Sequence, residues 1–356
     1  MSRFLSKRYS QIEPYTPGEQ PKVMNLIKLN TNESPFPPSP NVIKALNEAE
    51  VSKLNLYSDP DTREVIAAIA KTLGINENQI LMGNGSDEIL AFAFQAFCDK
   101  EHQPCFADIT YGFYPVFCEL FNLEPEIIPL RDDLSIEPSD YFDKNKPIFI
   151  ANPNAPTGLA LTLSQIEEIL IHNQDNIVLI DEAYVDFGAE SAISLIDQYP
   201  NLIVSRTFSK SRNLAGARLG FAVSNPDIIA DMCKMKFSFN PYNINRLSII
   251  AGKEAMLDTE YFDKCISEII KTREHTVNEL LKRGFSIPES KTNFIFAKHR
   301  SLSGTDYFNA LRKRNILVRH FDKEGIKDHV RITIGSKEQM DSLIEATDDI
   351  LKGDRA

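Results

Sequence analysis

Two kinds of hydrophobic pattern alternate along most of this chain. Short, nearly continuous apolar runs, rich in β-branched residues, occur at 79–82, 148–151, 177–180, 202–205 and 219–223. Runs of this length are typical of strands that are covered on both faces. Segments with a helical period lie between them. The alternation predicts an α/β fold with a mostly parallel sheet.

Helices are expected where apolar residues recur every three to four positions. The segment after residue 60 has this period, with Val65, Ile69 and Leu73 on one face. A second helix should run from Ser86 to about Phe97. Helix starts are predicted from residues that can cap a helix. These are Ser86 and the capping-box pairs Asp61 with Glu64, Ser164 with Glu167, and Ser336 with Gln339.

The pattern changes after about residue 250. A long charged amphipathic segment covers 258–283, and strands are expected at 293–297, 316–318 and 330–334. Helices are expected near 304–314 and 337–351. These elements predict a smaller α+β domain.

The N-terminal stretch to about residue 41 is rich in proline. Proline fixes φ and removes a donor, so this stretch should be mostly extended. An arm of this kind needs its own body or a partner subunit to order it. We therefore expect an arm and part of the small domain at 1–45, a large domain at 46–250 and a small domain at 251–356.

Composition excludes several classes of protein. The 356 residues are 42% hydrophobic and 25% charged, which is ordinary globular usage rather than that of a disordered chain. The net charge of −11 argues against nonspecific binding to nucleic acid or anionic lipid. No uncharged apolar run approaches the roughly 18 residues of a membrane helix. The start of the chain has no apolar segment typical of a secretory signal.

Cysteine and histidine form no metal or disulfide pattern. The five cysteines include no C-x-x-C pair, and the six histidines are scattered. The expectation is therefore no metal site and reduced thiols in the cytoplasm.

Polar residues follow four of the predicted strands. Asp181 and Lys210 each lie just beyond an apolar run, and two turns, 83–87 and 152–158, follow two others. Ligands of open α/β sheets bind at such strand ends, and a helix N-terminus such as the one after 83–87 favours an anion. Each signal alone has an ordinary alternative: a tight turn, a helix cap or a solvated lysine.

Four motifs in this order resemble those of the fold-type I pyridoxal-phosphate aminotransferases. They are Asn152-Pro-Asn-Ala-Pro-Thr-Gly158, Asp181-Glu-Ala-Tyr184, Thr207-Phe-Ser-Lys210 and Arg218. The resemblance covers about 10–351. The segments 14–21, 27–34, 318–319 and 330–335 are similar to the histidinol-phosphate aminotransferase subfamily. The implied fold is aspartate aminotransferase-like, with a mostly parallel sheet in a large domain and a smaller α+β domain.

The resemblance assigns roles around pyridoxal 5′-phosphate. Lys210 would form a Schiff base with its aldehyde and later move a proton between the substrate carbon and the cofactor C4′. Asp181 would keep the pyridine nitrogen protonated, and Tyr184 would donate to the ring O3′. Tyr111 would stack on the ring, although a core aromatic is the alternative.

The resemblance also implies a phosphate site and a shared active site. The cofactor phosphate would bind Ser86, Asp87, Ser209 and Arg218. Tyr57 matches a tyrosine that reaches the phosphate of the neighbouring subunit, which implies a homodimer with shared sites.

Substrate groups are assigned in the same way. Arg331 would bind the α-carboxylate of the amino donor. Arg319 and Tyr15 would bind the phosphate of histidinol phosphate or the side-chain carboxylate of glutamate, and Asn32 would line the pocket. A surface charge is the alternative for Arg319.

One position departs from the family pattern. The asparagine that usually precedes Pro-Thr-Gly and binds O3′ is Ala155 here. Either Asn154 replaces that contact, or Tyr184 binds O3′ without it.

These assignments imply a transaminase that moves an amino group between glutamate and imidazole-acetol phosphate in histidine biosynthesis. The alternatives are an aromatic amino-acid aminotransferase and a lyase of the threonine-phosphate decarboxylase type. A non-enzymatic regulator that binds pyridoxal phosphate is disfavoured by the acidic charge of the chain.

Overall fold

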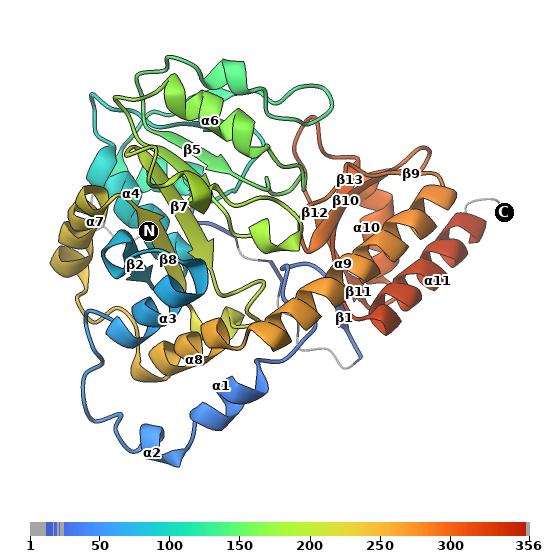
Figure 1. Ribbon diagram of the computed structural model, residues 1–356. Helices are drawn as coiled ribbons and strands as arrows, with labels where there is room; N and C mark the ends of the chain where they lie inside the picture. The colour runs from blue at the N-terminus through green and yellow to red at the C-terminus, as the bar shows by residue number, and fades with distance from the viewer. Residues whose placement is uncertain (1–11, 17, 20, 22–24, 354–356) are drawn as a thin grey trace, which may run out of the picture.

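The computed structural model describes residues 12–16, 18, 19, 21 and 25–353 (Figure 1). It has a large part around a seven-stranded sheet and a smaller part around a four-stranded sheet, which is coloured orange and red on the right of Figure 1. Within the described residues, no helix is both long enough and apolar enough to cross a membrane.

The large sheet has the strand order β2-β8-β7-β6-β5-β3-β4. Strands β3 to β7 run parallel, and β8 runs antiparallel to both β7 and β2. The prediction of a mostly parallel sheet is thus confirmed. The strands are β2 (Ile80–Gly83), β3 (Cys105–Ala107), β4 (Glu126–Ile128), β5 (Ile148–Ala151), β6 (Val178–Asp181), β7 (Leu202–Thr207) and β8 (Gly220–Ser224).

Alternate residues of the central strands pack into separate cores on the two faces of the sheet. In β6, Val178 and Ile180 belong to one core and Leu179 to the other. This division follows from the two-residue period of a strand, and it explains why each run is apolar throughout. The helices of this part are α3 (Arg63–Leu73), α4 (Ser86–Phe97), α5 (Tyr114–Phe121), α6 (Leu163–Ile171), α7 (Pro226–Phe239) and α8 (Arg246–Leu257).

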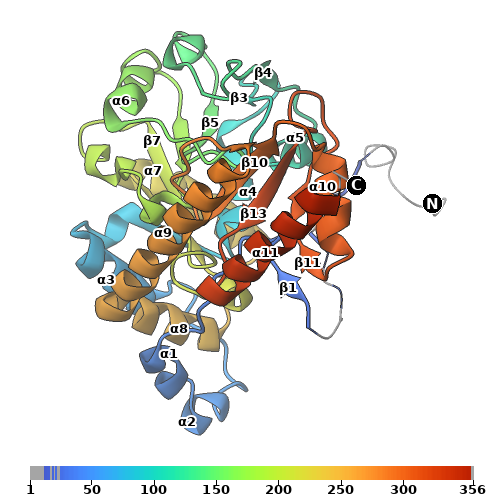
Figure 2. The ribbon, with the colours of Figure 1, turned by 90° about the vertical axis from the view of Figure 1, so that its right-hand side faces the viewer.

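The smaller sheet is antiparallel, in the order β12-β13-β10-β9. Helices α9 and α11 lie side by side across its outer face (Figure 2). These elements are β9 (Phe285–Ser286), β10 (Phe294–His299), β12 (Arg319–His320), β13 (His329–Thr333), α9 (Thr259–Lys282), α10 (Gly304–Arg312) and α11 (Lys337–Gly353). The helices and strands expected after residue 258 are therefore present.

The N-terminal segment packs against the small part of the molecule. Strand β1 (Ile27–Lys28) pairs in parallel with β11 (Ile316–Leu317), and Leu29 is buried in the same core as Ile332. The extended arm ends in α1 (Pro40–Ala45), which is followed by α2 (Glu48–Val51). The predicted domain limits at 45 and 250 stay predictions.

Short 3₁₀ turns complete the chain. They are η2 (Glu77–Gln79), η3 (Pro138–Tyr141), η4 (Val185–Phe187), η5 (Ala192–Leu195) and η6 (Ala215–Ala217).

Three of the predicted helix starts are wrong, and one is confirmed. The capping box of α6 is formed by Thr162 and Gln165, two residues earlier than Ser164 with Glu167. Both pairs have suitable residue types, and the start of the apolar face decides between them. At α11, Ser336 and Gln339 exchange hydrogen bonds as predicted.

The starts of α3 and α4 differ for backbone reasons. Thr62 precedes α3 with a left-handed φ of 51°, and the Asp59 carboxylate accepts from the N–H of Arg63, so Asp61 is not the cap. Ser86 is the first helical residue of α4, after Gly85 with a φ of 82°. Glycine is favoured there because L side chains rarely adopt this positive φ, and a Cβ atom would also lie 2.7 Å from the Arg218 guanidinium.

Candidate active site

A small cavity of about 150 Å³ lies at the carboxyl ends of the parallel strands. Strands β5, β6 and β7 end there in register, since Asp181 pairs with Ala151 on one side and Ser205 on the other. Eight of the predicted cofactor residues line this cavity: Ser86, Asp87, Tyr111, Asp181, Tyr184, Ser209, Lys210 and Arg218.

Asp181 has one carboxylate oxygen without a hydrogen-bond partner among the described residues. Its Oδ2 accepts from the hydroxyl of Tyr114 at 3.4 Å, whereas its Oδ1 is buried and unpaired. Burial, and next the charge of Asp87, raises the pKa of Asp181 to about 7. A buried carboxyl of this kind is suited to a cationic ligand atom. Tyr114 was missed in the sequence, because nothing in its local pattern separates it from a core aromatic.

A cluster of N–H donors and one guanidinium lines the same cavity. Ser86 and Asp87 begin α4, where backbone N–H groups have no helical partner. The Arg218 guanidinium donates to Ser209 Oγ at 3.4 Å and to Asp87 Oδ2 at 3.2 Å. Gly220 lets the two segments approach, since a Cβ there would lie 2.4 Å from the Ser86 nitrogen. This arrangement can bind a phosphate.

Lys210 lies where the small cavity meets a larger one. Its Nζ donates to the Thr31 carbonyl at 3.3 Å and lies 5.7 Å from the centre of the Tyr184 ring. Lys210 lines both cavities, as do Tyr111, Tyr184 and Ala155. The Tyr111 hydroxyl donates to Asp87 Oδ1 at 2.7 Å, which orients its ring.

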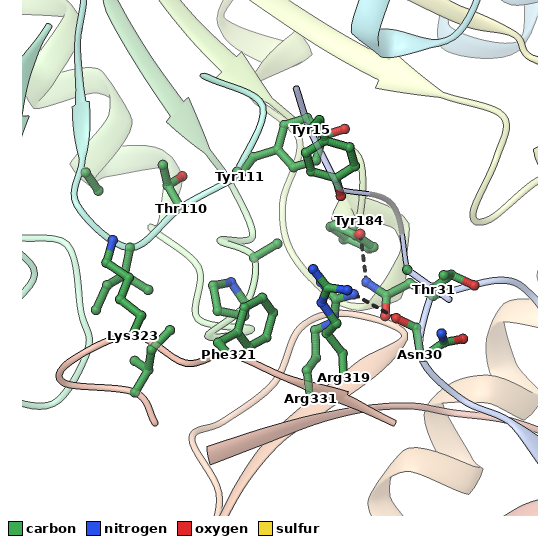
Figure 3. Close-up of a pocket in the computed structure, with 18 of the residues that line it drawn as sticks. Tyr15, Asn30, Thr31, Thr110, Tyr111, Tyr184, Arg319, Phe321, Lys323 and Arg331 are labelled. Atoms are coloured by element: carbon green, nitrogen blue, oxygen red, sulfur yellow. Dashed lines mark hydrogen bonds between the residues drawn. The ribbon is translucent and has the colours of Figure 1, made fainter. Parts of the chain in front are cut away.

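The larger cavity, of about 450 Å³, contains the predicted substrate residues (Figure 3). Arg319 and Arg331 lie in it side by side, with Tyr15 among the aromatic residues facing them. Arg331 donates to the Asn30 carbonyl at 3.1 Å, and its Nε has no partner among the described residues. Burial lowers the pKa of Arg331, but the guanidinium stays charged at neutral pH. Asn30, Phe321 and Lys323 also line the cavity and were not identified from the sequence.

Asn32 is hydrogen-bonded to the hydroxyl group of Tyr184. Its Nδ2 donates to the Tyr184 hydroxyl oxygen at 2.9 Å, and its Oδ1 accepts from Thr333 at 3.0 Å. Because Asn32 donates to that oxygen, the hydroxyl proton of Tyr184 is left for another acceptor.

Two predicted cofactor residues do not line either cavity. Asn154 is buried; its Nδ2 donates to the Ile109 carbonyl at 2.9 Å, and its Oδ1 has no partner in the described structure. Tyr57 is 80% exposed and stacks on Tyr242 with ring centres 4.6 Å apart. Its predicted contact belongs to a second subunit, so a single chain leaves it untested.

Comparison with known proteins gives consistent similarities. The model of the family described as aminotransferase class I and II matches residues 24–346. A histidinol-phosphate aminotransferase of Brachyspira hyodysenteriae is 52% identical over 353 residues, which are 99% of this chain and 100% of that protein.

Solved structures share the fold. The histidinol-phosphate aminotransferase of Sinorhizobium meliloti, in complex with pyridoxal-5′-phosphate, has a TM-score of 0.83 at 23% identity, covering 92% of this chain and 91% of that one. The L-threonine-O-3-phosphate decarboxylase of Porphyromonas gingivalis has a TM-score of 0.79 at 23% identity, covering 92% and 100%. The predicted fold class is confirmed.

Proposed function

Because this chain belongs to the family of class I and II aminotransferases, we propose that it exchanges an amino group between L-glutamate and imidazole-acetol phosphate in L-histidine biosynthesis. The products of this exchange, and the substrates of the reverse reaction, are 2-oxoglutarate and histidinol phosphate. One observation carries the proposal: Lys210 lies between a cavity with a carboxylate and a phosphate-type donor cluster and a cavity with two arginines. The relative that is 52% identical over its full length supports the choice of substrate.

The small cavity fits pyridoxal phosphate in its donors. When bound, this cofactor supplies an aldehyde for the amino group and a ring that withdraws electrons from the substrate α-carbon. The unpaired Oδ1 of Asp181 suits a protonated ring nitrogen, and the start of α4 with Arg218 suits the phosphate. Both groups line the same cavity, as the cofactor requires.

Each side chain around Lys210 has a separate role toward the cofactor. Asp181 would hold the proton on the ring nitrogen, while the Tyr184 hydroxyl would donate to the ring oxygen O3′. Tyr111, which is oriented by its hydrogen bond to Asp87, would pack on the ring. The Lys210 amine would bind the aldehyde of the cofactor and would be the group that moves a proton between the substrate α-carbon and C4′.

The two arginines bind the anionic ends of both substrates. Arg331 holds the α-carboxylate of glutamate. Arg319, with Tyr15, holds either the phosphate of histidinol phosphate or the second carboxylate of glutamate. Arginine suits both groups because its planar fork donates two parallel hydrogen bonds to either.

A homodimer in the cytoplasm is part of the proposal. Exposed apolar side chains gather between α2 and α3 and at the end of α7, including Leu54, Leu56, Tyr57, Phe239 and Tyr242. Such side chains are suited to pack against a second copy of the chain. This contact would bring Tyr57 to the cofactor phosphate of the partner subunit. All five cysteines are free thiols, which supports a reducing compartment. Sedimentation should give a mass near twice 40.2 kDa.

The test is an absorbance titration of the protein loaded with pyridoxal phosphate. Histidinol phosphate should convert the long-wavelength band to the shorter-wavelength band of the amine form of the cofactor. Phenylalanine and threonine phosphate serve as parallel additions and should leave the spectrum almost unchanged. A spectrum that responds to phenylalanine instead, or carbon dioxide released from threonine phosphate, would replace this substrate with one of the two alternatives.

A further inference from the structure

A cluster of charged side chains joins two segments of the site, namely the segment that follows Tyr184 and the turn that carries Lys210. Asp186 lies in η4, two residues after Tyr184. Its Oδ1 accepts from the guanidinium of Arg206 in β7, and its Oδ2 accepts from the hydroxyl of Ser211 at 2.5 Å. Arg206 precedes Lys210 by four residues, and Ser211 follows it directly. One carboxylate therefore bonds both ends of the turn that carries Lys210.

The charges of the cluster make this contact a strong one. Burial alone would raise the pKa of Asp186, but Arg206 and the Ser211 hydroxyl outweigh burial and hold that pKa below its ordinary value. Asp186 is therefore ionised at neutral pH, and hydrogen bonds to an ionised acceptor are about twice as strong as neutral ones.

A second carboxylate faces the same arginine from the other side. Glu182 Oε2 lies 3.6 Å from Arg206 and accepts from the Ser191 hydroxyl at 2.7 Å. Ser191 lies 19 residues before Lys210 and does not line either cavity. The cluster thus contains two serines that donate to buried or partly buried carboxylates, and only Ser211 adjoins Lys210.

Other contacts also hold the turn. The N–H of Phe208 donates to the Leu219 carbonyl at 2.9 Å, and the N–H of Asn213 donates to the Lys210 carbonyl at 3.3 Å. Within the turn, the N–H of Ser209 donates to Thr207 Oγ1 at 3.1 Å. The Lys210 amine itself has one bond of 3.3 Å, to a carbonyl on the N-terminal segment. Two side-chain contacts therefore flank the amine: Ser209 accepts from Arg218, and Ser211 donates to Asp186.

We propose that Asp186 and Ser211 are positioning residues that fix the Lys210 amine toward Tyr184 and the cofactor aldehyde, an inference that rests on the proposed function. Reactions between a bound group and a side chain are sensitive to displacements well below 1 Å, so loss of the contact between Asp186 and Ser211 should act on the Lys210 bond more than on folding.

The experiment compares Ser211→Ala with the matched control Ser191→Ala. Three quantities are measured: the dissociation constant of pyridoxal phosphate, the pH midpoint of the long-wavelength absorbance of the loaded protein, and the melting temperature. Ser211→Ala should weaken cofactor binding about tenfold and move the pH midpoint by about half a unit or more. Ser191→Ala should change neither the dissociation constant nor the pH midpoint, although its melting temperature should fall by about as much as that of Ser211→Ala. Ser211→Thr keeps the hydroxyl and should restore both values.

Three outcomes overturn or separate the proposals. Wild-type values in Ser211→Ala overturn the inference, as do equal shifts in both serine variants, because these would indicate a purely structural role. Asp186→Asn gives a second reading, and its pH midpoint should move in the same direction as that of Ser211→Ala. Lys210→Ala must lose the band that reports on the amine. If that variant keeps the wild-type spectrum, the proposed function itself fails, whereas a normal loss of the band with an unchanged Ser211→Ala overturns only the positioning role.

Discussion

Arg319 of β12 and Arg331 of β13 are direct partners across two antiparallel strands. In the part of the chain that the structure describes, neither forms an ion pair with a carboxylate. The Arg331 guanidinium lies 5.3 Å from the centre of the Phe294 ring, and both guanidiniums lie within 6 Å of Phe321. Like charges directly opposite each other destabilise a sheet. The pair therefore depends on an anionic ligand for its compensation.

Replacing Arg331 by lysine should lower kcat/KM for both amino donors about a hundredfold. Lysine keeps the charge but loses the planar fork that binds a carboxylate through two bonds. Steady-state kinetics with glutamate and histidinol phosphate measure the effect. Arg314→Lys, at an exposed position after α10, is the control and should retain normal kinetics. A small effect of Arg331→Lys would mean that another group binds the α-carboxylate.

Replacing Arg319 by glutamine should stabilise the protein without ligand while weakening turnover. Removing one of two facing cations relieves their repulsion by about 0.5 kcal/mol, which corresponds to a rise of about 0.7 °C in the melting temperature of a chain of 356 residues. The rise should shrink in high salt, because salt screens the repulsion. Thermal unfolding at two ionic strengths tests this. A lower melting temperature would show that Arg319 has a stabilising partner.

The stability of the protein without cofactor should fall as the pH rises from about 4 to 7. Asp181 has a pKa of about 7 when folded, above its value in an unfolded chain, so the folded state binds the proton more tightly. Ionisation on raising the pH then favours unfolding, by on the order of 4 kcal/mol in total. Asp181→Asn should remove this part of the pH dependence.

Denaturant unfolding at pH 5 and pH 8 compares the two proteins. Glu182 contributes a slope of the same sign, since burial raises its pKa to about 7 as well, so the difference between wild type and Asp181→Asn is the quantity to measure. Equal slopes in the two proteins contradict the prediction. The variant should also lose most of its turnover, because the ring nitrogen no longer has a carboxylate.

Lys210→Ala should abolish transamination and still bind pyridoxal phosphate. The phosphate contacts at α4 and Arg218 and the carboxylate of Asp181 do not depend on the lysine. Equilibrium dialysis measures the retained binding, and a coupled assay measures the loss of turnover. Near-normal turnover of this variant would refute the central assignment.

Asn154→Ala should lower both the melting temperature and the affinity for pyridoxal phosphate. The side chain donates to the carbonyl of Ile109, two residues before Tyr111, so its loss leaves a buried carbonyl unpaired at a cost of about 1–3 kcal/mol. The loop that carries Tyr111 should then loosen. Unchanged cofactor retention and turnover would show that Asn154 does not take the place of the asparagine missing at position 155.

Local sequence determined the elements and the chemistry of their ends. The strand runs at 148–151 and 177–180 were located within one residue, because a strand buried on both faces must be apolar throughout. Asp181 and Lys210 were noticed as polar groups after such runs, and the resemblance of the motifs that contain them to those of a known family assigned their roles. Strands β3 and β4 were missed because each has only three residues, too few to show a period.

The tertiary structure decided which distant groups meet. Arg319 opposes Arg331 because the register of two antiparallel strands places them so, and Asp186 reaches Ser211 because β6 and β7 are neighbours in the sheet. Tyr114 reaches Asp181 only because α5 packs into the core on one face of the sheet. A hydrophobic pattern reports only the period of a single segment. These contacts arise from the packing of one segment against another, and only the folded chain determines that packing.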